Sequence, residues 1–266
     1  CGAMLIGLGD DDVAARFPLA RGRGRWCPAD GVVDTAGLLQ AYLTGRPVLF
    51  GIRVVSWSAD GERLRVSAIS GGREPGPPDL TIISRILVNA AGPWGGILGG
   101  LPLTPCNRHV FMTPPMPEID PSWPFIWDVG HGLYFRPESG GLLLSPCDET
   151  PAPPGAYVED PKMLEELCQK LERFQPALSQ VAIASGWVGQ RTFAPDRRYV
   201  IGFDPREPRL FHVAGLGGHG VTASWSVGRL AADLILGRPV PDWASLFSPS
   251  RFDSARLLPW SMAESA

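Results

Sequence analysis

A glycine-rich turn at residues 215–220 is the segment whose residue types and spacing most directly suggest chemistry. Its sequence, Gly215-Leu-Gly-Gly-His-Gly220, has G-x-G-x-x-G spacing and lies between a strand-like run and a helical run. There, backbone N–H groups and a helix dipole can hold a dinucleotide pyrophosphate. A Rossmann unit also needs a second parallel strand with an acidic residue about 20 residues on, which Pro239 and Pro241 argue against. The pyrophosphate interpretation is rejected, which leaves a site for another electron-rich group or a plain strand-to-helix turn.

Other polar residues exclude several classes of site. The run Arg21-Gly-Arg-Gly-Arg25 has too few cations for a nucleic-acid tract, and a net charge of −3 argues against such a partner. The five cysteines are widely spaced, with no C-x-x-C pair and no Cys/His cluster, so no metal is expected. They predict free thiols in a reducing compartment, and hence a cytoplasmic protein. The chain starts at Cys1 without an initiator methionine or a signal-peptide pattern, so we expect that residue 1 is not the start of a natural reading frame.

Hydrophobic periodicity and turn residues predict the elements that position these side chains. The apolar spacing predicts helices over 35–43, 161–174 and 222–236. Strands are predicted over 2–9, 48–55, 81–89, 132–136, 141–145 and 209–214. A hairpin over 57–66 is predicted to turn at Asp60-Gly61. No apolar run reaches the roughly 18–20 residues of a membrane span.

Two kinds of sequence pattern alternate along the chain and predict its domain organisation. Residues 30–100 and 186–240 have an α/β pattern, whereas residues 1–29 and 101–185 have the pattern of an antiparallel sheet with a helix. Residues 241–266 are expected to form a C-terminal tail. The sequence therefore predicts an α/β (α+β) fold, in which an antiparallel-sheet substrate domain is interleaved with a nucleotide-binding domain. A hydrophobic content of 44% and a charged content of 19% exclude a disordered chain.

Six segments together resemble the D-amino acid oxidase superfamily of FAD-dependent oxidoreductases, which includes glycine oxidase, sarcosine oxidase and D-amino acid dehydrogenase. They are Gly31–Asp34, Leu87–Trp94, Leu133–Ser145, Gly189–Asp196, Tyr199–Gly202 and Leu210–Thr222. Their order and spacing make the resemblance specific, and it covers nearly the whole chain. The family's N-terminal βαβ unit, with its own G-x-G-x-x-G and ribose-binding acid, has no counterpart here. The resemblance thus implies an incomplete FAD/NAD(P)-binding-type domain, from a truncation, a processed fragment or one half of a split protein.

The resemblance assigns roles to individual residues. It implies that Arg191 pairs with the substrate carboxylate, because a guanidinium fork binds a carboxylate bidentately; the alternative is a surface arginine. It implies that Tyr134 faces the substrate; the alternative is a half-buried strand aromatic. It places the backbone of Val54 at the adenine, and an outward-facing His219 would not be a base. The other residues that it places along FAD are Ala90, Ala91, Gly92, Trp94, Gly215, Gly217, Gly218, Gly220, Val221 and Thr222.

The function implied by the resemblance is oxidation of the amine of a small amino acid, of the D-amino acid, glycine or sarcosine type. The Cα hydride would pass to FAD, leaving an imine that hydrolyses. Two other classes remain open. One is a non-catalytic fragment or subunit that binds FAD only with a partner or a missing N-terminal segment, and exposed sheet edges would then favour such a partner or a homo-oligomer. The other is a nucleotide- or ligand-binding module that uses residues 215–220 alone.

Overall fold

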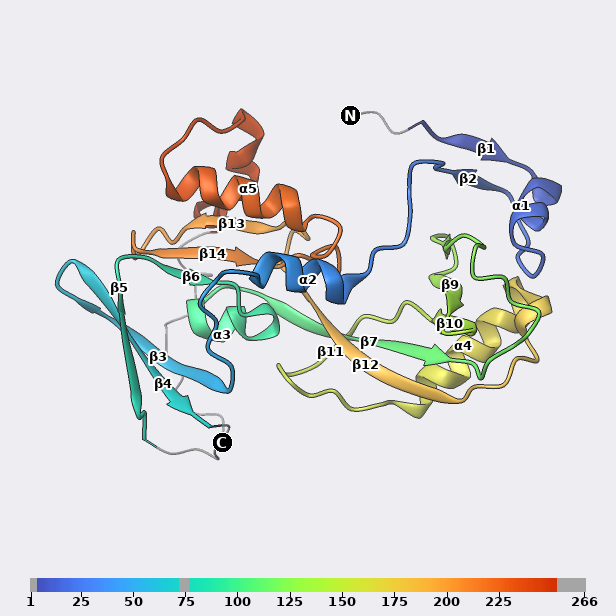
Figure 1. Ribbon diagram of the computed structural model, residues 1–266, viewed down its shortest axis with the longest axis horizontal. Helices are drawn as coiled ribbons and strands as arrows, with labels where there is room; N and C mark the ends of the chain where they lie inside the picture. The colour runs from blue at the N-terminus through green and yellow to red at the C-terminus, as the bar shows by residue number, and fades with distance from the viewer. Residues whose placement is uncertain (1–3, 72–76, 253–266) are drawn as a thin grey trace. The chain divides into compact units, whose positions relative to one another are not determined.

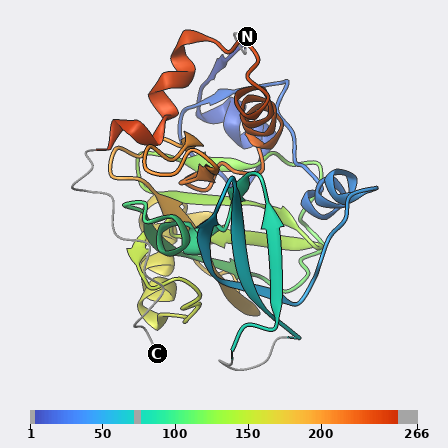
Figure 2. The same ribbon diagram turned by 90° about the vertical axis from the view of Figure 1, so that its left-hand side faces the viewer.

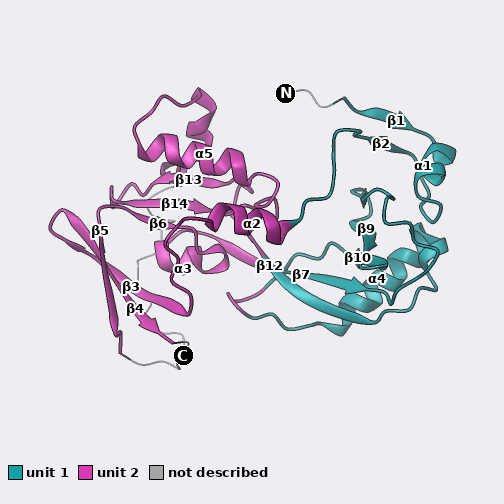
Figure 3. Ribbon diagram, viewed as in Figure 1, with its two compact units in different colours: residues 1–34, 107–151, 156–190 teal, residues 35–106, 152–155, 191–266 magenta. Residues whose placement is uncertain are grey.

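The computed structural model describes residues 4–71 and 77–252, and the chain forms two compact units (Figure 3). Unit 1 comprises residues 1–34, 107–151 and 156–190, and unit 2 comprises residues 35–106, 152–155 and 191–266. Each unit is therefore assembled from segments that are far apart in the sequence.

Unit 1 is built mainly on an antiparallel sheet and one helix. The strand order is β11-β7-β10-β9-β8, and β12 also pairs with β7. The strands are β7 (Thr104–Met112), β8 (Ile126–Asp128), β9 (Leu133–Glu138), β10 (Gly141–Ser145), β11 (Thr150–Pro151) and β12 (Ser185–Phe193). A separate ribbon pairs β1 (Ile6–Leu8) with β2 (Gly24–Trp26) around α1 (Asp10–Arg16).

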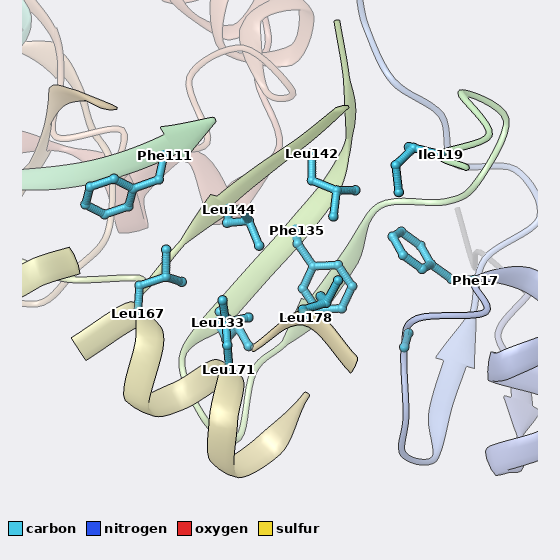
Figure 4. Close-up of a cluster of buried hydrophobic side chains, with 11 residues drawn as sticks. Phe17, Phe111, Ile119, Leu133, Phe135, Leu142, Leu144, Leu167, Leu171 and Leu178 are labelled. Atoms are coloured by element: carbon cyan, nitrogen blue, oxygen red, sulfur yellow. The ribbon is translucent and has the colours of Figure 1, made fainter. Parts of the chain in front are cut away.

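The core of unit 1 forms where α4 (Pro161–Phe174) packs on the sheet. Asp160 caps this helix, because its side chain accepts a hydrogen bond from the backbone N–H of Lys162, and Pro161 suits the first helical position. Strand alternation turns every second residue of β9 and β10 toward the helix. The resulting cluster contains Leu133, Phe135, Leu142, Leu144, Leu167 and Leu171 (Figure 4).

Unit 2 contains two three-stranded sheets (Figures 1 and 2). In the first, β14 (Leu210–Ala214) lies between β13 (Val200–Phe203) and β6 (Leu87–Asn89), antiparallel to β13 and parallel to β6. Helix α5 (Ser224–Ile235) packs on this sheet, burying Val227 and Leu230 with Phe211. The second sheet is the meander of β3 (Ile52–Asp60), β4 (Arg63–Ser70) and β5 (Leu80–Ser84).

Short elements complete both units. The remaining α-helices are α2 (Thr35–Leu43) and α3 (Gly95–Gly99). The 3-10 turns are η1 (Gly92–Trp94), η2 (Pro176–Leu178), η3 (Asp242–Phe247) and η4 (Pro249–Arg251). No helix within residues 4–71 and 77–252 is both long and apolar enough to cross a membrane. Within the same residues, Cys27, Cys106, Cys147 and Cys168 form no disulfide, and Cys1 lies outside them.

The helices and the hairpin agree best with the predictions. The helices predicted over 35–43 and 161–174 are confirmed, and the third begins at Ser224. The predicted hairpin forms, but its turn is Gly61-Glu62, one residue beyond the predicted Asp60-Gly61, because Asp60 still pairs with Arg63. The strand predicted over 48–55 begins only at Ile52. Of the strand predicted over 2–9, only Ile6–Leu8 pairs, and residues 2 and 3 lie outside the described residues.

A single strand over 81–89 was a wrong prediction. The chain forms β5 and β6 there, and these belong to different sheets, with a break at residues 85–86. Ser84 and Arg85 interrupt the apolar run at this point. Short polar interruptions also occur within single strands, so the pattern alone does not reveal the change of sheet. Of the predicted tail, residues 242–251 form η3 and η4, and residues 253–266 lie outside the described residues.

Candidate functional site

Two loops of unit 2 leave the same edge of one sheet. Strands β6 and β14 are parallel, with Val88 opposite Phe211 and Asn89 opposite His212. The turn after β6 contains Ala90, Ala91 and Gly92, and the loop after β14 is the glycine-rich turn. Ligands of α/β sheets bind at the carboxyl ends of parallel strands. The sheet thus brings two of the predicted segments to an edge that suits a ligand.

The glycine-rich loop is shaped by backbone conformation and by close packing. Gly215, Gly217 and Gly218 all have positive φ angles, of 65°, 56° and 86°, where a side chain would be strained. The N–H of Gly217 donates to the carbonyl oxygen of Thr192 at 3.0 Å, which ties the loop to β12. At Gly218 an added Cβ would lie 2.6 Å from Cδ and 2.8 Å from Cζ of Arg191. The Arg191 side chain therefore lies directly against the Gly218 backbone.

The loop that precedes α5 presents backbone donors. Within residues 4–71 and 77–252, no acceptor pairs with the N–H groups of Gly218, Gly220 and Val221. Thr222 closes the turn, because its hydroxyl donates to the carbonyl oxygen of His219 at 3.1 Å. His219 itself is exposed. The loop can thus offer backbone N–H groups to an electron-rich group just before the helix begins.

The turn after β6 is fixed by hydrogen bonds to a buried asparagine. Asn89 is fully buried; its Oδ1 accepts from the N–H of Ala91 at 3.3 Å, and its Nδ2 donates to the carbonyl oxygen of Gly95 at 2.8 Å. Gly92 has a φ of 53°, and an added Cβ would meet no atom within 4 Å. Trp94 follows and is half-exposed. The turn is therefore fixed on one side and open on the other.

Sequence reasoning missed the polar network behind this turn. Asn89 Nδ2 lies 3.2 Å from Nδ1 of buried His212, whose Nε2 lies 3.0 Å from Asp204. Arg206 binds the same carboxylate through Nε and Nη2. Burial opposes ionisation of Asp204, but the hydrogen bonds from His212 and Arg206 outweigh it and hold its pKa well below the usual range. The sequence holds one signal of this network, a polar residue in each of two otherwise apolar strands: Asn89 in β6 and His212 in β14.

Tyr134 and Val54 lie on other sheets. Tyr134 is on β9 of unit 1, opposite Ser145 and Trp127, with its ring 5.5 Å from that of Phe125. Arg191 belongs to unit 2, so a shared substrate site for Tyr134 and Arg191 stays a prediction. Val54 lies on β3 of unit 2 beside a β-bulge, and its contact with adenine also stays a prediction.

Metal ligands do not gather in the described part of the chain. Across residues 4–71 and 77–252, no group of three or more His, Cys, Asp or Glu side chains is placed to hold a metal ion.

A family comparison identifies the class to which this fold and these motifs belong. The family model described as DAO, FAD dependent oxidoreductase, matches residues 5–234, and the chain belongs to that family. The resemblance inferred from the sequence is thereby confirmed, as is a mixed α/β fold related to these oxidases.

Relatives give the comparison more detail. Glycine oxidase of Bacillus licheniformis is 25% identical over 236 residues, which are 82% of this chain and 58% of that protein. FAD-dependent oxidoreductase domain-containing protein 1 of Bos taurus is 27% identical over 175 residues, or 57% and 35% of the two chains. This chain therefore spans about one third to three fifths of the length of these curated relatives.

Solved structures show the same fold. L-proline dehydrogenase from P. horikoshii superposes with a TM-score of 0.78 at 21% identity, covering 94% of this chain and 69% of that one. Glycine oxidase from Geobacillus kaustophilus gives a TM-score of 0.78 at 21% identity, covering 95% and 68%. At these identities the likeness describes the fold alone.

Proposed function

We propose that the chain is part of an FAD-dependent oxidoreductase that oxidises the amine of a small amino acid. The supporting observation is that two loops leave one sheet edge while Arg191 lies against the backbone of one of them. When bound, FAD would accept a hydride from the substrate Cα, and the resulting imine would hydrolyse in water. The proposal is made for small amino acids as a class, which includes the glycine, sarcosine, proline and D-amino acid types.

The residues present fit a flavin. The open side of Gly92 leaves room for a close backbone approach, since an added Cβ there would project into empty space. The N–H groups of Gly218, Gly220 and Val221, in the loop before α5, suit an electron-rich ring edge. Ala90, Ala91 and Trp94 on one loop, and Gly215, Gly217, His219 and Thr222 on the other, complete the proposed contacts. Val54 would add a backbone contact from β3.

Arg191 would bind and orient the substrate. A guanidinium group offers two parallel N–H donors to a carboxylate, which fixes the direction of the Cα–H bond as well as the position of the substrate. A substrate contact through the Tyr134 hydroxyl is proposed from the resemblance alone. A neutral amine needs no protein base for hydride loss, so His219 has only a backbone role. No further ionisable group is required for this step.

Flavin retention tests the proposal directly. The purified chain is mixed with FAD and desalted, and its visible absorption is recorded. Retained flavin absorption supports the proposal, and a colourless protein overturns FAD binding by this chain. Gly92→Ala should weaken retention, because its Cβ enters the space proposed for FAD. Gly237→Ala is the matched control, since Gly237 also has a positive φ, of 64°, and open space around its Cβ, but lies beyond the far end of α5.

A second candidate is that FAD binds only when another segment or polypeptide covers unit 2. Helix α2 is rich in leucine and alanine, yet none of its residues is buried, and Leu39 is 58% exposed. Nearby in sequence, Phe50 is 82% exposed. Strand β6 is the last strand of its described sheet, and Val88 on it is 45% exposed. These exposed apolar side chains and the open strand edge are what such a covering segment would bury.

The same spectrum separates the two candidates. A chain that is colourless alone, but retains flavin when a βαβ segment with its own glycine-rich turn is supplied as a separate polypeptide, supports the second candidate. A chain that retains flavin alone contradicts it.

A further inference from the structure

Unit 2 contains a continuous polar network that the proposed chemistry does not use directly. It consists of Asn89, His212, Asp204 and Arg206, which we call the Asn89 network. The first three are at most 2% exposed, and Asn89 and His212 are 123 residues apart in the sequence. Buried polar groups of this kind are costly unless every partner is present.

The hydrogen bonds allow one protonation state of His212. Asn89 Nδ2 carries two hydrogens, one donated to the carbonyl oxygen of Gly95 and the other directed at His212 Nδ1. Nδ1 must therefore accept, so the ring proton sits on Nε2 and is donated to the Asp204 carboxylate at 3.0 Å. A proton on Nδ1 would place two donors against each other. His212 is thus neutral, with its proton on Nε2.

The network also fixes the helix that follows the turn. Arg206 Nη2 donates to the carbonyl oxygen of Gly99, the last residue of α3, at 2.8 Å. An added Cβ at Gly99 would lie 2.5 Å from Cε1 of His212 and 2.6 Å from Nδ2 of Asn89. Helix α3 therefore packs directly against the His212 and Asn89 side chains at Gly99.

We propose that His212 is a positioning residue: through its Nε2–H tautomer it orients the Asn89 amide, which in turn sets the backbone of Ala90, Ala91 and Gly92 for FAD. This inference rests on the proposed function, since the turn is one of the two proposed flavin-binding segments. The hydrogen bonds that transmit this effect run from Asp204 through His212 to Asn89, and from Asn89 to the N–H of Ala91 and the carbonyl of Gly95.

The tautomer can be measured in the unmodified chain by histidine nitrogen NMR. His109 of unit 1 provides an internal contrast, because its Nδ1 lies 2.7 Å from Asp148 and its Nε2 accepts from the backbone N–H of Asp160. The two buried histidines should therefore show opposite tautomers, with the proton on Nε2 in His212 and on Nδ1 in His109. A proton on Nδ1 of His212 would overturn the inference without any variant.

Variants then test the positioning effect. His212→Leu should speed amide exchange of the 89–95 turn without flavin, and weaken FAD binding, each by about tenfold, equivalent to one net hydrogen bond. His212→Gln should restore most of both, because an amide can donate to Asp204 and accept from Asn89. Gly99→Ala should have the effect of His212→Leu while every polar group is kept. His109→Leu is the matched control, and it should lower the melting temperature without changing exchange at 89–95.

The outcomes separate the two proposals. Unchanged exchange at 89–95 in His212→Leu overturns the positioning role, and so does failure of His212→Gln to restore it, or the same exchange change in His109→Leu. If the unmodified chain retains no FAD, the proposed function of this chain fails, while the tautomer and exchange results still decide the role of His212.

Discussion

At the scale of single residues, the position of Arg191 depends on a glycine. Gly218 adopts a φ of 86°, and the guanidinium lies where a Cβ at this position would be. Only glycine provides both the conformation and the space, so the loop and the arginine are mutually dependent. The loop could be predicted because its residues are contiguous, whereas its contact with Arg191 joins segments that only the fold brings together.

Removing the Arg191 side chain should affect substrate binding most. Arg191→Ala should raise KM for an amino-acid substrate about 10–100-fold, the effect of losing a charged hydrogen-bonded pair. Arg191→Lys should be intermediate, because an ammonium group lacks the planar fork. Steady-state kinetics on a flavin-loaded form of the protein measures both. Arg198→Ala is the nearby control, and an Arg191→Ala variant with the same KM as this control would contradict the assignment.

The polar partners of the turn mark the limit of sequence reasoning at this scale. Asn89 and His212 each lie in a segment that carries the family resemblance, so the sequence already drew attention to both segments. Their pairing was not, because 123 residues separate them and parallel strands bring them into register. Sequence motifs thus predict which loops form a site, and tertiary structure decides which buried groups support them.

At the scale of elements, periodicity predicts long helices well and short or split elements poorly. Helix α4 has apolar residues at helical spacing and an Asp-Pro start, so its bounds follow from the sequence. Helix α1 has only seven residues and was not predicted, although Asp10, Asp11 and Asp12 in its first turn favour the positive end of a helix dipole. The change of sheet between β5 and β6 coincides with only two polar residues, Ser84 and Arg85, which is too short an interruption to distinguish two strands from one.

Two glycines of unit 2 should respond oppositely to the same substitution. Gly228 lies inside α5 with no atom within 4 Å of an added Cβ, so Gly228→Ala should stabilise by about 0.5–1 kcal/mol through helix propensity. Gly218→Ala should destabilise by about 1–2 kcal/mol, because its φ is left-handed and the new Cβ displaces Arg191. Thermal unfolding of both variants beside the parent chain measures the difference, and equal shifts would contradict it.

At the scale of the whole molecule, several carboxylates of unit 2 are kept ionised by partners that stabilise the folded chain at neutral pH. Burial opposes ionisation of Asp204, but hydrogen bonds from His212 and Arg206 lower its pKa. Hydrogen bonds from arginine side chains likewise lower the pKa of Asp196 and Glu207. All three carboxylates belong to unit 2. Because their pKa values are lower in the folded chain than in the unfolded chain, the unfolded chain binds more protons in acid.

This difference gives the pH dependence its sign. The stabilisation should be complete above about pH 5, since unfolded carboxyl groups titrate near pH 4, and it should be lost progressively as the pH falls below that value. The denaturation midpoint in urea, measured at intervals from pH 7 to pH 3, should therefore fall below about pH 5. Asp204→Asn should lower the midpoint at pH 7 and flatten its dependence on pH, because the neutral amide has no proton to gain. Asp120→Asn is the control: the pKa of Asp120 is also lowered, by its hydrogen bonds with Ser122, but its carboxylate is exposed to water, and the slope should stay close to that of the parent. A parent chain whose midpoint is constant between pH 5 and pH 3 would show that these ion pairs contribute nothing to folding.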